Sequence, residues 1–220
     1  MRSSPNFYVF TRALTPAHAP PPTPTPTHAH AAQQGLVDLY AFDGVGEFRY
    51  TGEWSLMGNI AGKGPEYTGW ERWLLGWLKD SQVACLGAGQ GAPLALAPLT
   101  RAAAPGAKLI VVPTGGGGGG GGTTAVCVEY RVAEGYDAAI PKPGLLVYFM
   151  DTSLATGEGP LRVLPLNATD NSKLFATLAV GEALEYAGVR VQHTGVDAAG
   201  NALVGVTPAE DAPTTTQHTQ

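Results

Sequence analysis

Hydrophobic residues recur with two different periods along this chain, and the period changes near residue 83. Before that point, five large apolar residues have the i, i+3, i+4, i+7, i+8 spacing of one α-helical face: Trp70, Trp73, Leu74, Trp77 and Leu78. The sequence Thr68-x-x-Glu71 has the form of a capping box that begins a helix, and Gly76 is suited to ending one. The pattern therefore predicts a short, buried, tryptophan-rich helix over about residues 69–75.

After residue 83, short apolar or alternating runs bounded by Gly, Pro and Asp predict antiparallel strands. These runs cover residues 107–113, 125–132, 144–151, 160–166, 186–196 and 202–207. In the run 125–132, Cys127, Glu129 and Arg131 share one face, and the even-numbered residues from 126 to 132 share the other. Residues 197–201 form a hairpin turn between the last two runs. We expect a small antiparallel β-sandwich or open barrel packed on the tryptophan-rich helix.

Low-complexity segments divide the chain into four parts. Residues 1–34 are rich in Pro, Thr, His and Ala, a composition that favours extended polyproline II structure, and we expect a disordered leader. An organelle transit peptide, or a segment that replaces a lost catalytic half, are alternatives for this leader. Residues 35–82 hold the tryptophans, residues 83–208 form the β-rich part, and residues 209–220 form a second disordered tail. No run approaches the length of a membrane span.

Composition excludes several functions. The net charge is −5 and the 13 Lys and Arg residues do not cluster, which argues against nucleic acid or an anionic membrane as a partner. The glycine run 115–122 lacks the Lys-Ser/Thr ending of a phosphate loop, so we interpret it as a flexible hairpin loop.

Cys85 and Cys127 are expected to be buried thiols, or a disulfide if the chain is exported. Asn167 begins a glycosylation sequon that matters only in an exported chain.

Three segments of this chain resemble segments of one protein family, and they occur in the same order. They are GLVDLY from residue 35, W-S-L-M-G from Trp54 and W-E-R-W-L-L-G-W-L from Trp70. This order is similar to that of the immune-inhibitor-A-type zinc metallopeptidases, in which an H-E-x-x-H-x-x-G helix precedes the first segment. Residues 142–163 also resemble the β-rich part that follows the peptidase core. The resemblance implies an α+β fold: the remnant of a zincin-type core, with its methionine turn and tryptophan-rich helix, followed by a β-sandwich-like domain.

The resemblance also implies a set of site residues. His28 falls at the first zinc-ligand position, Asp38 at the acidic third ligand, and Met57 at the methionine beneath the metal. Ala29 stands where the family has the glutamate that activates water, and Ala32 where it has the second histidine. In an alternative interpretation, His28 is a solvated histidine of the leader and Asp38 is a turn residue.

The sequence therefore predicts a truncated or degenerate metallopeptidase-like protein, without activity in this form. Zinc is the cofactor of the family, and a peptide or protein is its substrate. The alternative is a non-catalytic β-sandwich module that binds a partner, and a structural protein without a ligand is a third possibility. The family is mostly secreted, yet the first residues contain no secretory signal pattern, so the compartment is left open. The sequence leaves the oligomeric state open as well.

Overall fold

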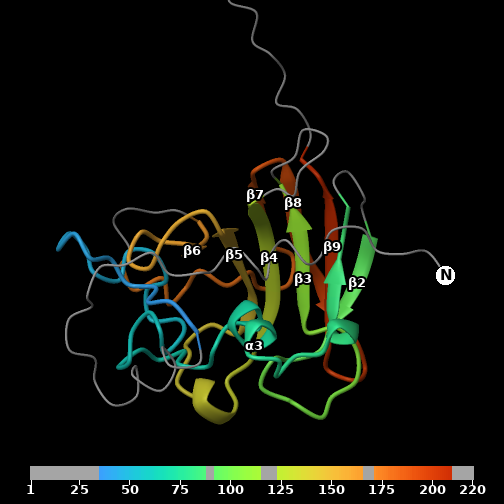
Figure 1. Cartoon of the computed structure of the whole chain (residues 1–220). Coiled ribbons are helices and arrows are strands. Elements are labelled where there is room, and N and C mark those ends of the chain that lie inside the picture. The colour runs from blue at the N-terminus through green and yellow to red at the C-terminus, as the bar shows by residue number, and fades with distance from the viewer. Residues whose placement is uncertain (1–34, 88–91, 115–122, 166–170, 210–220) are drawn as a thin grey trace, which may run out of the picture.

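The computed structural model describes residues 35–87, 92–114, 123–165 and 171–209 (Figure 1). The predicted leader, the glycine run, Asn167 and all of the tail except Ala209 lie outside these residues, as does His28. Within the described part the fold is mostly β, with two sheets and a single short α-helix. No helix in these ranges is long and apolar enough to cross a membrane.

The first sheet has five strands in the order β1-β3-β4-β5-β6. Their bounds are Val83–Cys85, Leu109–Pro113, Thr124–Arg131, Gly144–Asp151 and Leu161–Val163. The second sheet has four antiparallel strands in the order β2-β9-β8-β7. β2 is Ala92–Leu96, β7 is Ala183–Tyr186, β8 is Val189–Val196 and β9 is Ala202–Pro208. The helical pieces are α3 (Gly69–Leu74) and two 3₁₀ turns, η1 (Asp80–Gln82) and η2 (Gly135–Asp137).

Alternating residues of the central strands build two separate hydrophobic layers. On β4, Val126 and Val128 point to the four-stranded sheet and pack with Val191, Val204 and other residues of β8 and β9. On the opposite face, Ala125 and Cys127 pack with residues that come from segment 36–78. The strands β3, β4 and β5 are buried on both faces, and this explains why their sequences are nearly continuous apolar runs.

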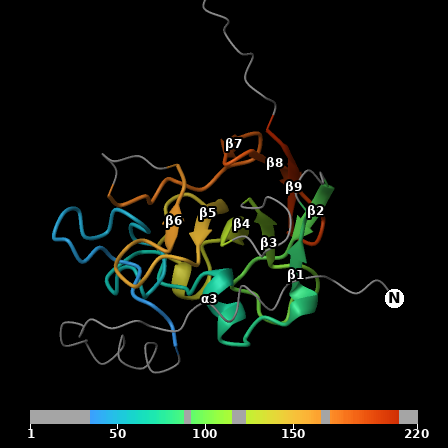
Figure 2. The same cartoon turned by 45° about the horizontal axis from the view of Figure 1, so that its top comes forward.

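The five-stranded sheet is thus the middle layer of the molecule. Figure 2 shows the four-stranded sheet on one side of it and α3 with the loops of residues 35–65 on the other. The first layer of contacts includes Trp54, Met57, Trp70 and Trp73, all with side chains at most 9% exposed. Segment 35–82 and the β-rich part therefore share one hydrophobic cluster.

Several sequence-based predictions are confirmed. The capping box is present: Thr68 is the N-cap of α3, and the Glu71 side chain accepts from its backbone N–H. The runs at 107–113, 125–132, 144–151 and 202–207 form β3, β4, β5 and β9 within two residues. Residues 197–201 make the turn between β8 and β9, where the Asp197 N–H donates to the carbonyl of Asn201.

Other predictions are right only in part or are wrong. The short helix predicted over residues 69–75 is present as Gly69–Leu74, but it is not tryptophan-rich: it carries two tryptophans, and Trp77 lies beyond it with a side chain that is 55% exposed. Gly76 adopts φ +71° and ends the helical part, as predicted, so Trp77 and Leu78 do not belong to the helical face on which the spacing had placed them. β1 pairs with β3 in parallel, so the larger sheet is mixed and not antiparallel.

Two further corrections concern the strand assignments. The run 186–196 contains a tight turn at Ala187 and Gly188, both with positive φ, which separates β7 from β8. The sequence pattern did not identify β1, β2 or β7 as separate strands.

Candidate functional site

The segment around Asp38 lies against the turn that contains Met57. The Leu39 N–H donates to the Met57 carbonyl at 3.0 Å. The Asp38 N–H donates to the Thr156 hydroxyl at 2.9 Å, which ties the same segment to the loop before β6. Residues 38 and 156 are thus joined across more than half of the chain, and the β-rich part holds the Asp38 segment in place.

The Met57 turn is built by a residue in a left-handed conformation. Ser55 has φ +65°, an uncommon value for a residue other than glycine, and its hydroxyl accepts from the Met57 N–H at 3.1 Å. Gly58 follows Met57 in this turn. A side chain does not fit at this position, because a Cβ there would lie 2.0 Å from the Thr51 hydroxyl oxygen. The Met57 side chain is fully buried in the layer beneath α3.

The same serine connects the turn to α3. Its hydroxyl lies 2.8 Å from each oxygen of the Glu71 carboxyl group. Glu71 also receives the Thr68 N–H at 2.7 Å and the Thr68 hydroxyl at 2.8 Å. The three segments that carry the family resemblance therefore form one hydrogen-bonded unit, in which Leu39 contacts the turn and the turn contacts the helix.

The Glu71 carboxyl group has an unusual acidity. Burial raises its pKa to about 7, because the charged form loses its hydration. The hydrogen bonds from Thr68 and Ser55 act in the opposite direction, and the nearby Glu129 adds to the rise. Glu71 is thus a buried group that titrates close to neutral pH.

A second buried carboxylate holds the start of α3 on the sheet. Glu129 of β4 accepts the Gly69 N–H at 2.5 Å and the Tyr148 hydroxyl at 2.9 Å. The Tyr148 oxygen in turn accepts the Trp70 N–H at 3.1 Å. Two of the unpaired N–H groups at the helix start are therefore satisfied by strands β4 and β5. Burial is the main reason that the pKa of Tyr148 is raised, so its hydroxyl stays protonated and donates to Glu129.

Arg131 neutralises this region from the same strand. Its guanidinium contacts Glu129 at 2.8 Å and Asp137 of η2 at 2.6 and 2.9 Å. It also donates to the carbonyls of Gly64 and Glu66, each at 3.2 Å. All three charged side chains are fully buried. The free-energy cost of removing a buried ion pair from water is offset only when its N–H groups find hydrogen-bond acceptors. Here each nitrogen of the Arg131 guanidinium donates a hydrogen bond.

The hydrogen-bonding capacity of this network is used within the protein. The oxygens of Glu129 and Glu71 accept hydrogen bonds from protein groups, and the adjacent cavity has a volume of only about 20 Å³, enough for a single water molecule. The cavity is lined by Glu71 and by apolar residues of segment 36–39, α3 and the β5–β6 region. In the described part of the chain these carboxylates hold α3 and the Met57 turn on the sheet.

The three residues that the resemblance implied for a metal site have different positions. Asp38 is half-buried beside Tyr40, and burial with the Asp38 charge raises the pKa of that phenol. Met57 lies beneath the same segment, and His28 is outside the described ranges. Over residues 35–87, 92–114, 123–165 and 171–209 no group of three His, Cys, Asp or Glu side chains could hold a metal ion. The described residues therefore do not supply a zinc donor set around Asp38.

The prediction of buried thiols is confirmed for Cys127 and wrong for Cys85. Cys127 is fully buried, but the Cys85 side chain is exposed. Both face Val111 in register, so they are two strands apart and their Cα atoms are roughly 9–10 Å from each other. A disulfide requires Cα atoms within about 7 Å, and both thiols are free.

Sequence reasoning placed Glu129 and Arg131 on one strand face but missed their role. The available signal was two opposite charges at i and i+2 inside an apolar strand, which is unusual unless the pair is buried and compensated. Asp137 carried no local signal, since its partner lies six residues away in a different element. Glu71 was identified only as a capping residue.

Comparisons with known proteins give no match: no protein family, no curated protein and no solved structure is significantly similar to this chain.

Proposed function

We propose that this chain is a degenerate scaffold of the immune-inhibitor-A-type metallopeptidases and does not hydrolyse peptides in this form. The observation that carries the proposal is the hydrogen-bonded unit of three segments, in which Leu39 donates to Met57 and Ser55 joins Glu71 of α3. The segments that resemble the family are separate stretches within residues 35–78, and their assembly around Met57 is what a shared ancestry predicts. Ala29 and Ala32 at the positions of the glutamate and the second histidine support the loss of activity.

The proposal is tested by rebuilding the missing ligands in the full-length chain. The substitutions Ala29→Glu and Ala32→His convert residues 28–35 into H-E-x-x-H-x-x-G. If the scaffold is of this type, the double variant should bind one zinc ion per chain in a calorimetric titration, and Asp38→Ala should abolish that binding. The unaltered chain should show no zinc-dependent cleavage of a denatured protein substrate.

Two controls sharpen the result. The single variant Ala29→Glu lacks the second histidine and should bind zinc no better than the unaltered chain. Zinc binding by the double variant that survives Asp38→Ala, or no gain at all, would contradict the proposed ancestry. Cleavage by the unaltered chain that stops with a chelator and with Asp38→Ala would contradict the proposed inactivity.

A second candidate is a non-catalytic module that binds a partner. The observation in its favour is the exposure of two large aromatic side chains next to α3, Trp77 at 55% and Tyr136 at 81%. Soluble domains rarely leave such rings uncovered without a binding role when they gather in one place.

A further inference from the structure

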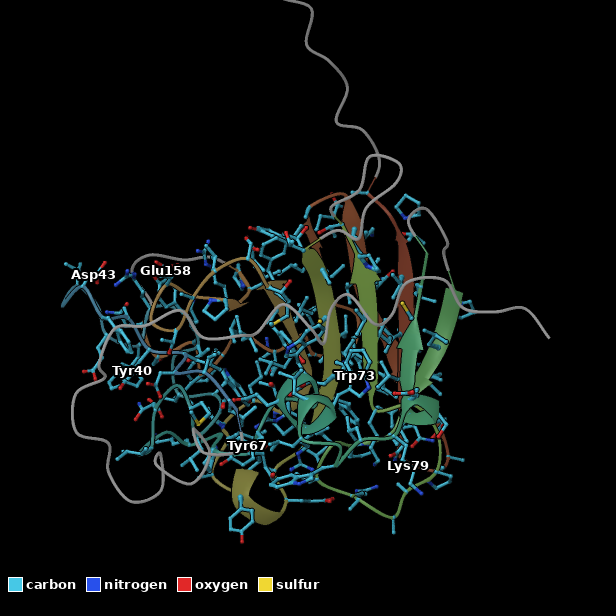
Figure 3. The ribbon with its side chains drawn as sticks, in the orientation of Figure 1. Tyr40, Asp43, Tyr67, Trp73, Lys79 and Glu158 are labelled. Carbon is cyan, nitrogen blue, oxygen red and sulfur yellow. The ribbon has the colours of Figure 1, made fainter. Side chains whose placement is uncertain are left out.

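Three aromatic side chains gather beside α3 on the surface of the molecule. Trp77 and Tyr136 are exposed, and Tyr67 is half-buried. The rings of Tyr67 and Trp77 meet edge to face with centroids 5.6 Å apart. Tyr67, Trp77 and Tyr136 are called the aromatic surface below. Figure 3 shows Tyr67 between α3 and the yellow coil of residues 135–137.

Glu66 connects the two halves of the aromatic surface. Its N–H donates to Asp137 at 3.2 Å, and its carboxylate lies next to Gly135. Tyr67 follows Glu66, and Tyr136 lies between Gly135 and Asp137, so both rings start from backbone segments in direct contact. Because Glu66 is also paired with Arg72 of α3, these half-buried contacts hold together the backbone segments from which the three side chains project.

The exposure of Trp77 is imposed by the backbone. Its N–H donates to the Arg72 carbonyl at 2.8 Å, and Gly76 at φ +71° turns the chain out of the helix before it. The ring is therefore held outside the core by the same turn that ends α3. The exposed indole of Trp77, with the Tyr67 ring at its edge, can therefore stack against a ligand.

Proline-rich segments are ligands that such a surface recognises. A polyproline II helix is already extended, so it loses little conformational entropy on binding, and its rings stack on aromatic side chains. The chain itself carries such a segment at residues 20–26, Pro-Pro-Pro-Thr-Pro-Thr-Pro. We propose that this proline tract of the leader docks on the aromatic surface of its own chain.

The connection is long enough for this contact. Leu36 and Leu74 line the same small cavity, and Trp77 follows Leu74 by three residues, at most about 10 Å of chain. The nine residues from Pro26 to Gly35 span about 28 Å in polyproline II geometry.

The proposal is tested with full-length protein and a fluorescent peptide of residues 16–27. In the test variant, Pro20, Pro21, Pro22, Pro24 and Pro26 are replaced by serine, which should release the aromatic surface. The peptide should bind this variant, as measured by fluorescence anisotropy, and should bind the unaltered chain at least about tenfold more weakly. The reason is that a tethered segment competes at an effective concentration in the millimolar range.

Point variants in the five-serine chain locate the binding site. Trp77→Ala and Tyr136→Ala should each weaken peptide binding about tenfold, since both side chains are exposed and do not support the core. Phe175→Ala removes an exposed aromatic ring, 64% accessible, elsewhere on the surface and should leave binding unchanged.

Three outcomes would overturn the proposal. They are no binding of the peptide by the five-serine chain, binding that Trp77→Ala leaves unchanged, and equal binding by the five-serine and unaltered chains. The last outcome would assign the aromatic surface to a proline-rich segment of another protein. The experiment uses no metal, so its result is independent of the proposed metallopeptidase ancestry.

Discussion

At Glu71 two opposing effects act on one carboxyl group. The donors Thr68 and Ser55 favour the charged carboxylate, whereas complete burial favours the neutral acid and has the larger effect. The sequence identified this glutamate through the capping box, a local pattern. It could not show the burial, because that depends on β4 and the Met57 turn covering the helix start. The same holds for Glu129, whose partners Gly69 and Tyr148 are 60 and 19 residues away.

The raised pKa of Glu71 predicts a pH dependence of stability. Its carboxyl group has a pKa of about 7 in the folded chain against an ordinary value of 4.5, so between these values the folded state binds more protons than the unfolded one. The contribution of Glu71 to stability is therefore complete below pH 4.5 and is lost as the pH rises through 7, by up to about 3 kcal/mol.

Urea unfolding between about pH 4.5 and 8 measures this effect. Glu71→Gln should flatten the fall in the free energy of unfolding over that range, since glutamine does not titrate. Glu182→Gln, at the surface beside Lys142, should leave the slope in place. An unchanged slope in Glu71→Gln would mean that another group causes it.

At the scale of the elements, glycines decide where the tight connections can form. Gly52 has φ +64°, and a Cβ there would lie 2.1 Å from the Ser172 carbonyl oxygen, so the turn before Trp54 fits closely against residue 172. Gly76 has a similar φ of +71° but open space around it. The sequence predicted the helix end at Gly76 from local rules. It did not predict the contact at Gly52, which joins segments about 120 residues apart.

Alanine substitutions at these two glycines distinguish the cost of a strained backbone conformation from the cost of a steric clash. Gly76→Ala should lower the free energy of unfolding by about 1 kcal/mol, the cost of a left-handed conformation for alanine. Gly52→Ala should cost about 3 kcal/mol or more, because the clash is with backbone and no side chain can move away. Chemical denaturation measures both, and equal losses would contradict the packing of Gly52 against Ser172.

At the scale of the whole molecule, the five-stranded sheet links two hydrophobic layers. Leu146 of β5 packs under α3 and the tryptophans, while its neighbour Leu145 packs against the four-stranded sheet. All four tryptophans lie between residues 54 and 77, so their fluorescence reports on the α3 side only. A substitution in the layer next to the four-stranded sheet shifts the unfolding transition seen by tryptophan fluorescence only if the two layers unfold together.

The variant Leu145→Ala tests this coupling. It removes a fully buried side chain from the layer opposite the tryptophans and should lower the free energy of unfolding by about 2–5 kcal/mol. Tryptophan fluorescence and far-ultraviolet circular dichroism should shift together to the same lower denaturant midpoint. A shift in circular dichroism alone would show that the α3 side unfolds independently.

The sequence by itself determined the local elements: the capping box at Thr68, the longer strands and the turn at residues 197–201. These features depend on neighbours within a few positions, so period and turn chemistry are enough to find them. Only the tertiary structure decided which charges are buried, where Trp77 points, how β1 pairs and which segments meet at Met57. Those outcomes depend on contacts between residues tens of positions apart, and the free energy of such contacts leaves no periodic trace in the sequence.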